Sequence, residues 1–200
     1  MTSLILLLLV AYLVGSLSFA VIVSRAMGLP DPHSYGSGNP GATNVLRSGS
    51  RLAAVLTLLG DALKGLVVLL VARQLPPEVG IGGFELGLAG LAAFLGHLYP
   101  VFFGFRGGKG VATAGGVLFG LSPSLGLGVL LCWLGTFVLT RISSAGALAA
   151  AVIAPLLSLV VPGDARVAAT VLVMSALLVW RHRENIRRLR AGTEGGVKSR

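Results

Sequence analysis

Residues 111–139 read VATAGGVLFGLSPSLGLGVLLCWLGTFVL, and this apolar stretch decides the topology of the chain. It is too long for one ordinary transmembrane helix, which needs about 20 residues. Residues 120–124 interrupt it with glycine, serine and proline, which are residues that end helices. We therefore expect two short helices in this stretch instead of one long helix.

The composition predicts that lipid surrounds most of the chain. Of its 200 residues, 54% are hydrophobic and only 12% are charged. A soluble protein of this size could not bury so much apolar surface. The formal net charge of +9 would also suit nucleic-acid binding, but the basic residues lie at the ends of the apolar runs and aromatic residues are few. We therefore expect no nucleic-acid partner.

The other apolar runs bring the expected number of transmembrane helices to seven. Besides the two helices in 111–139, these runs are Leu4–Ser24, Leu52–Val71, Phe84–Phe103, Ala145–Val161 and Val167–Trp180. The first run lacks a basic segment before it and is long enough to span, so we expect an uncleaved helix. The predicted fold is an all-α polytopic membrane protein with some short helices, forming a single domain over residues 1–200.

The positions of positive charge predict the orientation of these helices. With seven spans and the N-terminus outside, most basic residues and the C-terminus lie on the cytoplasmic side, as the positive-inside bias requires. With a single helix over 111–139, the arginine-rich segment 181–190 would face outward. We therefore expect the polar segments 31–51, 104–110 and 181–195 to meet on the cytoplasmic face and to form the active site.

Residues 34–47 read SYGSGNPGATNVLR and have the composition of an anion-binding loop. Glycine allows the backbone to approach a ligand closely, and arginine can bind phosphate through two parallel hydrogen bonds. The same composition also suits a turn-rich connection with a helix N-cap at Thr43 or Asn44. The density of small hydrogen-bond donors favours the anion site, with candidates Ser37, Gly38, Asn39, Gly41, Thr43, Asn44 and Arg47.

Residues 106–110 read RGGKG and precede an expected helix. The phosphate-loop pattern G-x-x-x-x-G-K-[ST] is not met, because glycine follows the lysine, so nucleotide hydrolysis is not expected. A glycine turn with a lysine at a helix N-terminus still favours an anion, although Arg106 or Lys109 alone would be explained by anchoring at the membrane edge. Nearby His97 suits either a core histidine that bonds a carbonyl group or a site residue.

Two further clusters carry ionisable groups. Asp61 and Lys64 lie three residues apart in the second expected span, where they neutralise each other, and we expect them to support the structure. Residues 181–194 read RHRENIRRLRAGTE, which also suits a basic helix lying on anionic lipid. That interpretation does not explain His182, Asn185 and Glu194, which we expect in a polar site.

Several chemistries are excluded by missing motifs. The chain has no H-x-x-x-x-D acyltransferase motif, no G-x-S-x-G motif and no H-E-x-x-H motif. Carboxylates are too few for a metal cage, and Cys132 is the only cysteine, so we expect no metal, no cofactor and no disulfide within the chain.

Three segments resemble the cytoplasmic motifs of the PlsY family, the bacterial acyl-phosphate:glycerol-3-phosphate acyltransferases. They are residues 36–47 (GSGNPGATNVLR), residues 96–113, which contain GGKGVAT, and residues 182–194 (HRENIRRLRAGTE). Residues 61–65 (DALKG) also resemble the second helix of the family, and the resemblance runs essentially from end to end. The chain departs from the family pattern Asp-Pro-Arg at His33.

The resemblance implies transfer of a fatty acyl group from acyl-phosphate to the 1-hydroxyl of glycerol 3-phosphate, giving lysophosphatidic acid and inorganic phosphate. It implies a seven-helix fold in the bacterial plasma membrane with the active site facing the cytoplasm. The implied partners are glycerol 3-phosphate, acyl-phosphate and the lipid bilayer, and no obligate protein partner is expected. A small transporter or channel for an organic phosphate is the alternative, but polar groups within the expected spans are largely limited to Asp61 and Lys64.

On this basis we expect catalytic roles for Ser37, Arg47, Lys109, His182 and Asn185. We expect substrate or phosphate binding by Gly38, Asn39, Gly41, Thr43, Asn44, His97, Arg106, Gly107, Gly108, Gly110 and Glu194. The expected mechanism is direct attack by the glycerol hydroxyl, whose proton passes to a substrate phosphate oxygen or to His182. A covalent acyl-Ser37 is the rival mechanism.

Overall fold

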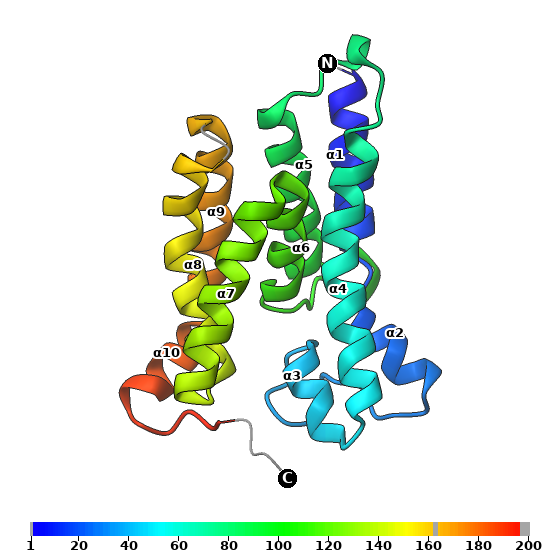
Figure 1. The fold of residues 1–200 in the computed structure, drawn as a ribbon. Helices are drawn as coiled ribbons and strands as arrows, with labels where there is room; N and C mark the ends of the chain where they lie inside the picture. Colours follow the sequence, from blue (N-terminus) through cyan, green and yellow to red (C-terminus); the bar gives the residue numbers. More distant parts are fainter. Residues whose placement is uncertain (1, 162–163, 197–200) are drawn as a thin grey trace.

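The computed structural model describes residues 2–161 and 164–196, and every regular element in these ranges is a helix (Figure 1). The expected all-α fold is therefore confirmed for the described chain. The helices are α1 (Thr2–Gly15), α2 (Phe19–Ala26), α3 (Ala42–Val45), α4 (Arg51–Ala72), α5 (Gly83–Leu98), α6 (Val111–Leu121), α7 (Pro123–Thr140), α8 (Ser143–Val160), α9 (Ala165–Arg181) and α10 (Arg183–Arg190). Short 3₁₀ turns lie at Leu46–Ser48, Pro77–Val79 and Val101–Phe103.

The predicted break in residues 111–139 lies at Ser122. This residue has an extended backbone conformation (φ −159°, ψ 126°) between the end of α6 and the beginning of α7. Pro123 occupies the first position of α7, where its missing N–H costs no intrahelical hydrogen bond. Arg73 donates a hydrogen bond of 2.7 Å to the carbonyl oxygen of Leu121, which would otherwise be free at the end of α6. The expectation of two helices is confirmed.

The helices differ in length more than seven transmembrane helices of ordinary length would. Four stretches are long and apolar enough to cross a membrane: Arg51–Ala72, Gly83–Phe103, Pro123–Thr140 and Ser143–Val160. Two bent pairs, α1 with α2 and α9 with α10, raise the number to six within the described residues if each pair is one span. The bends are 42° and 58°. The 11 residues of α6 rise only about 16 Å, roughly half of the hydrocarbon core.

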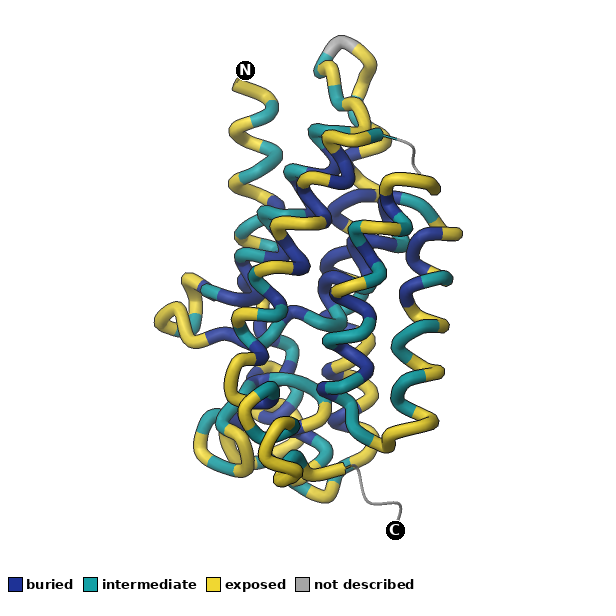
Figure 2. The backbone as a smooth tube through the Cα atoms, turned by 90° about the vertical axis from the view of Figure 1, so that its left-hand side faces the viewer, coloured by how far each residue is buried: buried dark blue, intermediate teal, exposed yellow. Residues whose placement is uncertain are grey.

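Small residues allow the helices to pack closely. A Cβ atom at Gly116 of α6 would lie 1.9 Å from the carbonyl oxygen of Ala62 in α4, and one at Gly96 of α5 would lie 2.2 Å from the carbonyl oxygen of Tyr12 in α1. Such contacts are typical of helix interfaces in membranes. Helices α1, α4, α7 and α8 carry exposed leucines as well as buried residues. Exposed and buried residues recur along the length of the helices (Figure 2).

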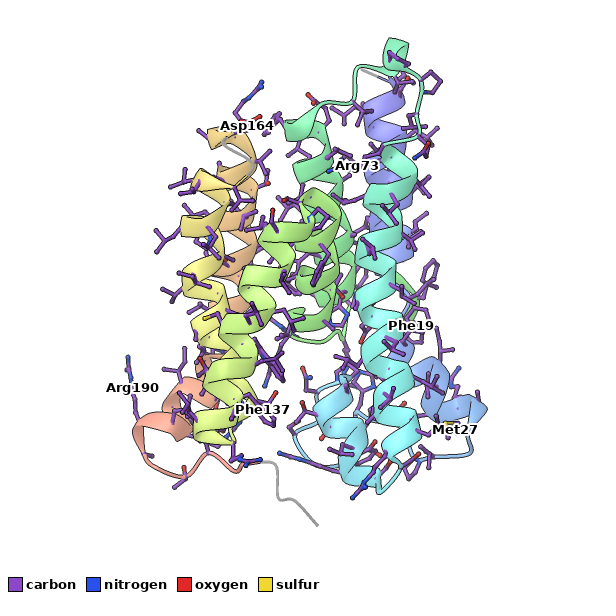
Figure 3. All side chains as sticks on the ribbon, viewed as in Figure 1. Phe19, Met27, Arg73, Phe137, Asp164 and Arg190 are labelled. Atoms are coloured by element: carbon purple, nitrogen blue, oxygen red, sulfur yellow. The ribbon has the colours of Figure 1, made fainter. Side chains whose placement is uncertain are left out.

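The arrangement places the polar segments at one end of the molecule. Helices α1 and α4 form one side, α7, α8 and α9 form the other, and α5 and α6 lie between them (Figure 1). The short helices α2, α3 and α10 lie at the same end, which carries Met27 and Arg190, whereas Arg73 and Asp164 lie at the opposite end (Figure 3). The segments 31–51, 104–110 and 181–195 therefore lie at the same end of the molecule, as expected.

Candidate functional site

The main cavity has a polar end and a long apolar part. Its volume is about 1020 Å³, and α4, α6, α7, α8 and α9 supply its apolar walls. Leu58, Phe119, Trp133 and Ala154 are typical of this wall. The polar end is lined by Ser37, Asn39, Thr43, Asn44, Arg47, Lys109, His182, Asn185, Arg188 and Glu194. The cavity can therefore hold a molecule with an anionic head and an apolar tail.

A second cavity of about 440 Å³ lies against the same polar residues. Its lining is Gly36, Ser37, Gly38, Asn39, Gly107, Lys109, Arg181, Arg183, Glu184 and Arg188. Ser37, Asn39, Lys109 and Arg188 contribute to both cavities. The two cavities are therefore neighbours, and these four residues line both of them.

A hydrogen-bond network joins Lys109 to the last polar segment. The Lys109 Nζ donates to Asn185 Oδ1 at 2.5 Å, and Asn185 Nδ2 donates to Glu194 Oε1. Ser144 donates to the same carboxylate oxygen at 2.6 Å, while Arg188 forms an ion pair with the other one. Both carboxylate oxygens of Glu194 therefore have partners. The hydrogen bond from Asn185 to Glu194 fixes the amide group that accepts from Lys109.

The surroundings of Lys109 and Glu194 shift the pKa values of both groups. Burial lowers the pKa of Lys109 to about 8, and the positive charge of Arg188 adds to this effect while Glu194 opposes it. Burial acts to raise the pKa of Glu194, but hydrogen bonds from Ser144, Arg188 and Asn185 outweigh it and hold that pKa below its ordinary value. At neutral pH the lysine is therefore mostly charged and the glutamate is ionised.

The loop before α3 is shaped by Asn44. This residue is buried, and its amide donates to the carbonyl oxygens of Pro32 and Tyr35. Its side-chain oxygen accepts the backbone N–H of Ser37 at 2.9 Å. Gly36 has a positive φ of 59°, and a Cβ atom there would lie 2.3 Å from Asn44 Oδ1. Asn44 therefore organises the loop through hydrogen bonds that use both ends of its amide.

Other residues of this loop keep their polar groups available. The side chain of Arg47 forms no hydrogen bond or ion pair with the residues that the structure describes, and it lines the main cavity. Ser37 Oγ likewise has no hydrogen-bond partner in the described chain. Thr43 Oγ1 lies 3.4 Å from Ser143 Oγ, and Gly41 lines the main cavity at the N-cap of α3.

His182 lies at the bend between α9 and α10. It is buried, and its Nδ1 lies 2.8 Å from the carbonyl oxygen of Leu178. Because a carbonyl oxygen only accepts, Nδ1 donates, and Nε2 is the nitrogen left for another partner. The residue lines the main cavity, so an acceptor nitrogen is available at its polar end.

His97, Asp61 and Lys64 form one buried cluster. Lys64 Nζ lies 2.9 Å from Asp61 Oδ1 and 2.9 Å from His97 Nδ1, and it donates to the carbonyl oxygen of Leu17 at 2.7 Å. The expected pairing of Asp61 with Lys64 is confirmed. The cluster reaches the glycine turn, because the Gly108 N–H donates to the His97 carbonyl oxygen at 3.1 Å.

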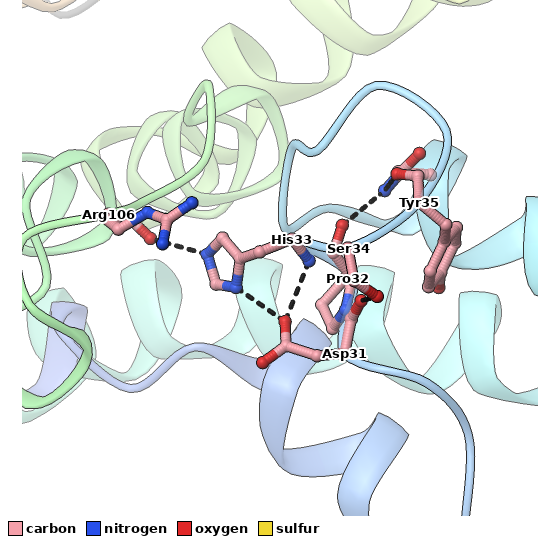
Figure 4. Close-up of polar contacts among 7 residues, drawn as sticks. Asp31, Pro32, His33, Ser34, Tyr35 and Arg106 are labelled. Carbon is pink, nitrogen blue, oxygen red and sulfur yellow. Dashed lines mark hydrogen bonds and ion pairs between the residues drawn. The ribbon is translucent and has the colours of Figure 1, made fainter.

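The glycine turn 104–110 is held from two further sides. Arg181 donates to the carbonyl oxygens of Gly107 and Gly108 at 2.7 and 3.1 Å. The Arg106 carbonyl oxygen lies 2.9 Å from His33 Nε2 (Figure 4). Arg106 and Gly108 are not among the residues that line either cavity, whereas Gly107 lines the second cavity and Gly110 the main one.

Three residues whose side chains form hydrogen bonds or ion pairs within the site were not predicted from the sequence: Ser144, Arg181 and Arg188. A signal existed for the two arginines, because Arg181, Asn185 and Arg188 follow helical spacing. Anchoring at the membrane edge explains every arginine of residues 181–190 equally well. The helical spacing alone therefore did not identify Arg181 and Arg188 as site residues. Ser144 has no sequence signal, since its role depends on the fold bringing it to Glu194.

Comparison with known proteins shows the family of the chain. The model of the glycerol-3-phosphate acyltransferase family matches residues 5–192. A glycerol-3-phosphate acyltransferase of Thiobacillus denitrificans is 57% identical over 195 residues, covering 98% of each chain. One from Burkholderia pseudomallei is 60% identical over 192 residues, covering 94% of this chain and 92% of the relative.

A solved structure has the same fold. The glycerol 3-phosphate form of PlsY, described as an integral membrane glycerol 3-phosphate acyltransferase, superimposes with a TM-score of 0.90 at 43% identity. The alignment covers 98% of this chain and 96% of that one. The crystal structure of the lysophosphatidic acid form of PlsY gives a TM-score of 0.89 at 42% identity. The fold and the site define a membrane-embedded acyltransferase, and the chain belongs to the PlsY family of glycerol-3-phosphate acyltransferases.

Proposed function

We propose that the chain transfers a fatty acyl group from acyl-phosphate to the 1-hydroxyl of sn-glycerol 3-phosphate, giving lysophosphatidic acid and inorganic phosphate. The observation that carries this proposal is the main cavity, whose cationic end continues into an apolar part among five helices. An acyl-phosphate has this shape and charge distribution. The related structures with glycerol 3-phosphate and with lysophosphatidic acid support the same acceptor and product.

Two phosphate groups must be held side by side in this reaction. Lys109 and Arg47 supply cations, and the loop before α3 supplies the polar side chains of Ser37 and Asn39. Lys109 lines both cavities, so we assign it contact with both substrates. Its charge stabilises the oxyanion and the leaving phosphate, which is where electrostatic catalysis has its largest effect.

The chemical step is a direct transfer. The glycerol 1-hydroxyl oxygen forms a bond to the acyl carbon, the bond from that carbon to the phosphate oxygen breaks, and inorganic phosphate leaves. The hydroxyl proton passes to a phosphate oxygen of the substrate or to Nε2 of His182, which is free of other described partners. Positioning of the two substrates supplies the remaining acceleration.

Ser37 holds substrate in this mechanism and is not acylated. In the described chain no histidine or carboxylate forms a hydrogen bond with its hydroxyl group, so no base is in place to activate it. Asn185 and Glu194 position Lys109, and Asn44 positions the loop.

Mass spectrometry tests the proposed acyl transfer. Purified protein with acyl-phosphate and glycerol 3-phosphate should yield 1-acylated glycerol 3-phosphate, and absence of that product would contradict the proposed function.

We also propose that the polar end faces the cytoplasm, with seven spans and the N-terminus outside. The basic residues of α10 and the loops support this orientation. Single cysteines in a Cys132→Ser background test it. A cysteine at Thr193 should react only after the inner face is exposed to the reagent, and one at Gln74 should react from outside. The reverse labelling would contradict the orientation.

A further inference from the structure

A histidine outside both cavities joins the two loops that carry Ser37 and Lys109. His33 Nε2 lies 2.9 Å from the Arg106 carbonyl oxygen (Figure 4). Within the described chain this is the only hydrogen bond between loop 31–51 and turn 104–110. The contact spans 73 residues of sequence and lies three residues before Lys109. A small movement of the turn at this point would displace the lysine.

The other ring nitrogen of His33 faces a carboxylate. Nδ1 lies 2.7 Å from Asp31 Oδ1, and the His33 backbone N–H donates to the same oxygen at 2.8 Å. The backbone hydrogen bond lowers the pKa of Asp31, so this carboxyl group is ionised throughout the neutral range. A carbonyl oxygen and an ionised carboxylate only accept hydrogen bonds. Both contacts are therefore satisfied together only when both ring nitrogens carry a proton.

We propose that His33 is a positioning residue for acyl transfer, because its doubly protonated ring holds turn 104–110 against loop 31–39. This inference rests on the function proposed above. The neutral ring lacks one of the two protons and leaves a lone pair facing an acceptor. The contacts that join the two loops are therefore complete only with the doubly protonated ring.

The charged groups around the ring differ in sign, and only Asp31 favours a positive charge on it. They are the Asp31 carboxylate on its own loop, the Arg25 guanidinium near the end of α2, which acts on Asp31, and the Arg106 guanidinium on the facing turn. The side chain of His33 is 16% exposed and that of Asp31 is 52% exposed, so water screens the ion pair. The ring therefore holds the turn by directed hydrogen bonds more than by charge alone.

Two substitutions at one position separate these roles. His33→Phe keeps a ring but removes both donors. His33→Arg supplies donors that stay charged at every accessible pH. Wild type and both variants are assayed for kcat and KM separately at acid pH, where Lys109 is charged. Hydrogen–deuterium exchange of residues 104–110 is measured on the same samples.

The expected outcomes differ for each protein. His33→Phe should lose about tenfold in kcat/KM at acid pH, the effect of losing one hydrogen bond to a charged group, and its turn should exchange faster. His33→Arg should keep the activity and the slow exchange, because its guanidinium group restores donors toward both acceptors. A His33→Phe variant with wild-type exchange and kcat/KM, or a His33→Arg variant as impaired as His33→Phe, would overturn the inference.

Failure of the proposed function would look different. Wild type itself would then form no acylated glycerol 3-phosphate at any pH, while the exchange difference between His33→Phe and His33→Arg persisted. Arg190→Gln serves as a control, because this exposed arginine of α10 lines neither cavity and its loss reports only the effect of removing a surface charge.

Discussion

Lys109 and Asn185 are 76 residues apart in sequence, and the ammonium group of the lysine donates a hydrogen bond to the side-chain oxygen of the asparagine. This contact joins the glycine turn before α6 to the helix that follows the bend at His182. Glu194 holds Asn185 from the other side. The cation at the polar end of the cavity is therefore fixed by a network instead of by the flexible lysine chain alone, which is the preorganisation that charge stabilisation requires.

Replacing Lys109 by methionine should remove most activity and leave the fold intact. The substitution keeps the apolar stem and deletes the charge that both cavities share. Loss of one positioned donor to a transition-state oxyanion typically costs about 10²–10³ in kcat. Steady-state kinetics measure this, with thermal unfolding in detergent as the test of folding. Turnover near the wild-type value would remove Lys109 from the site.

Activity should fall as pH rises through the pKa of Lys109. Burial lowers that pKa to about 8, and only the protonated form is a cation. The dependence of kcat/KM reports the free enzyme, so its alkaline limb should lie near pH 8. The limb in kcat should lie higher, because bound phosphate stabilises the charged lysine. A kcat/KM that stays constant to about pH 10 would contradict this assignment.

Two substitutions should move this alkaline limb in opposite directions. Glu194 raises the pKa of Lys109 and Arg188 lowers it. Glu194→Gln should therefore shift the limb to lower pH, while Arg188→Gln should shift it to higher pH. Glutamine can still accept the hydrogen bond from Asn185, so the first variant tests charge with little change of shape. Shifts of the same sign in both variants would contradict the proposed network.

The apolar part of the cavity should set acyl-chain preference. Ala154 of α8 is 3% exposed and lines this part, far along the helix from Ser143 at the polar end. Ala154→Phe fills space that the end of a long chain would occupy. We expect kcat/KM to fall for long acyl chains and to be retained for short ones, measured with acyl-phosphates of increasing length. An equal loss for every length would indicate a general packing defect.

The sequence contains enough information for the helices and for three of the polar segments, but not for their connections. Pro123 predicted the break between α6 and α7, because proline cannot continue a helix. The bend in the first apolar run was missed: α1 ends at Gly15 and α2 begins at Phe19, and serines at 16 and 18 are too common in membrane helices to signal a bend. Motif composition identified the candidate residues of the loops.

Tertiary contacts decide the roles that the sequence left open. Asn44 resembles a ligand donor in sequence, yet its amide is used by the carbonyl groups of its own loop. Arg188 resembles a membrane anchor, yet it pairs with Glu194 at the cavity. Both assignments depend on which distant backbone or carboxylate the fold brings close, and local composition does not contain that information.

The most direct test of the account is phosphate release from acyl-phosphate by the purified protein, with and without glycerol 3-phosphate. Direct transfer predicts that phosphate appears only when glycerol 3-phosphate is present and in equal amount to the acylated product. A control with the Lys109→Met variant should show neither. A burst of about one equivalent of phosphate per protein without glycerol 3-phosphate, together with an acyl group on Ser37, would contradict the account.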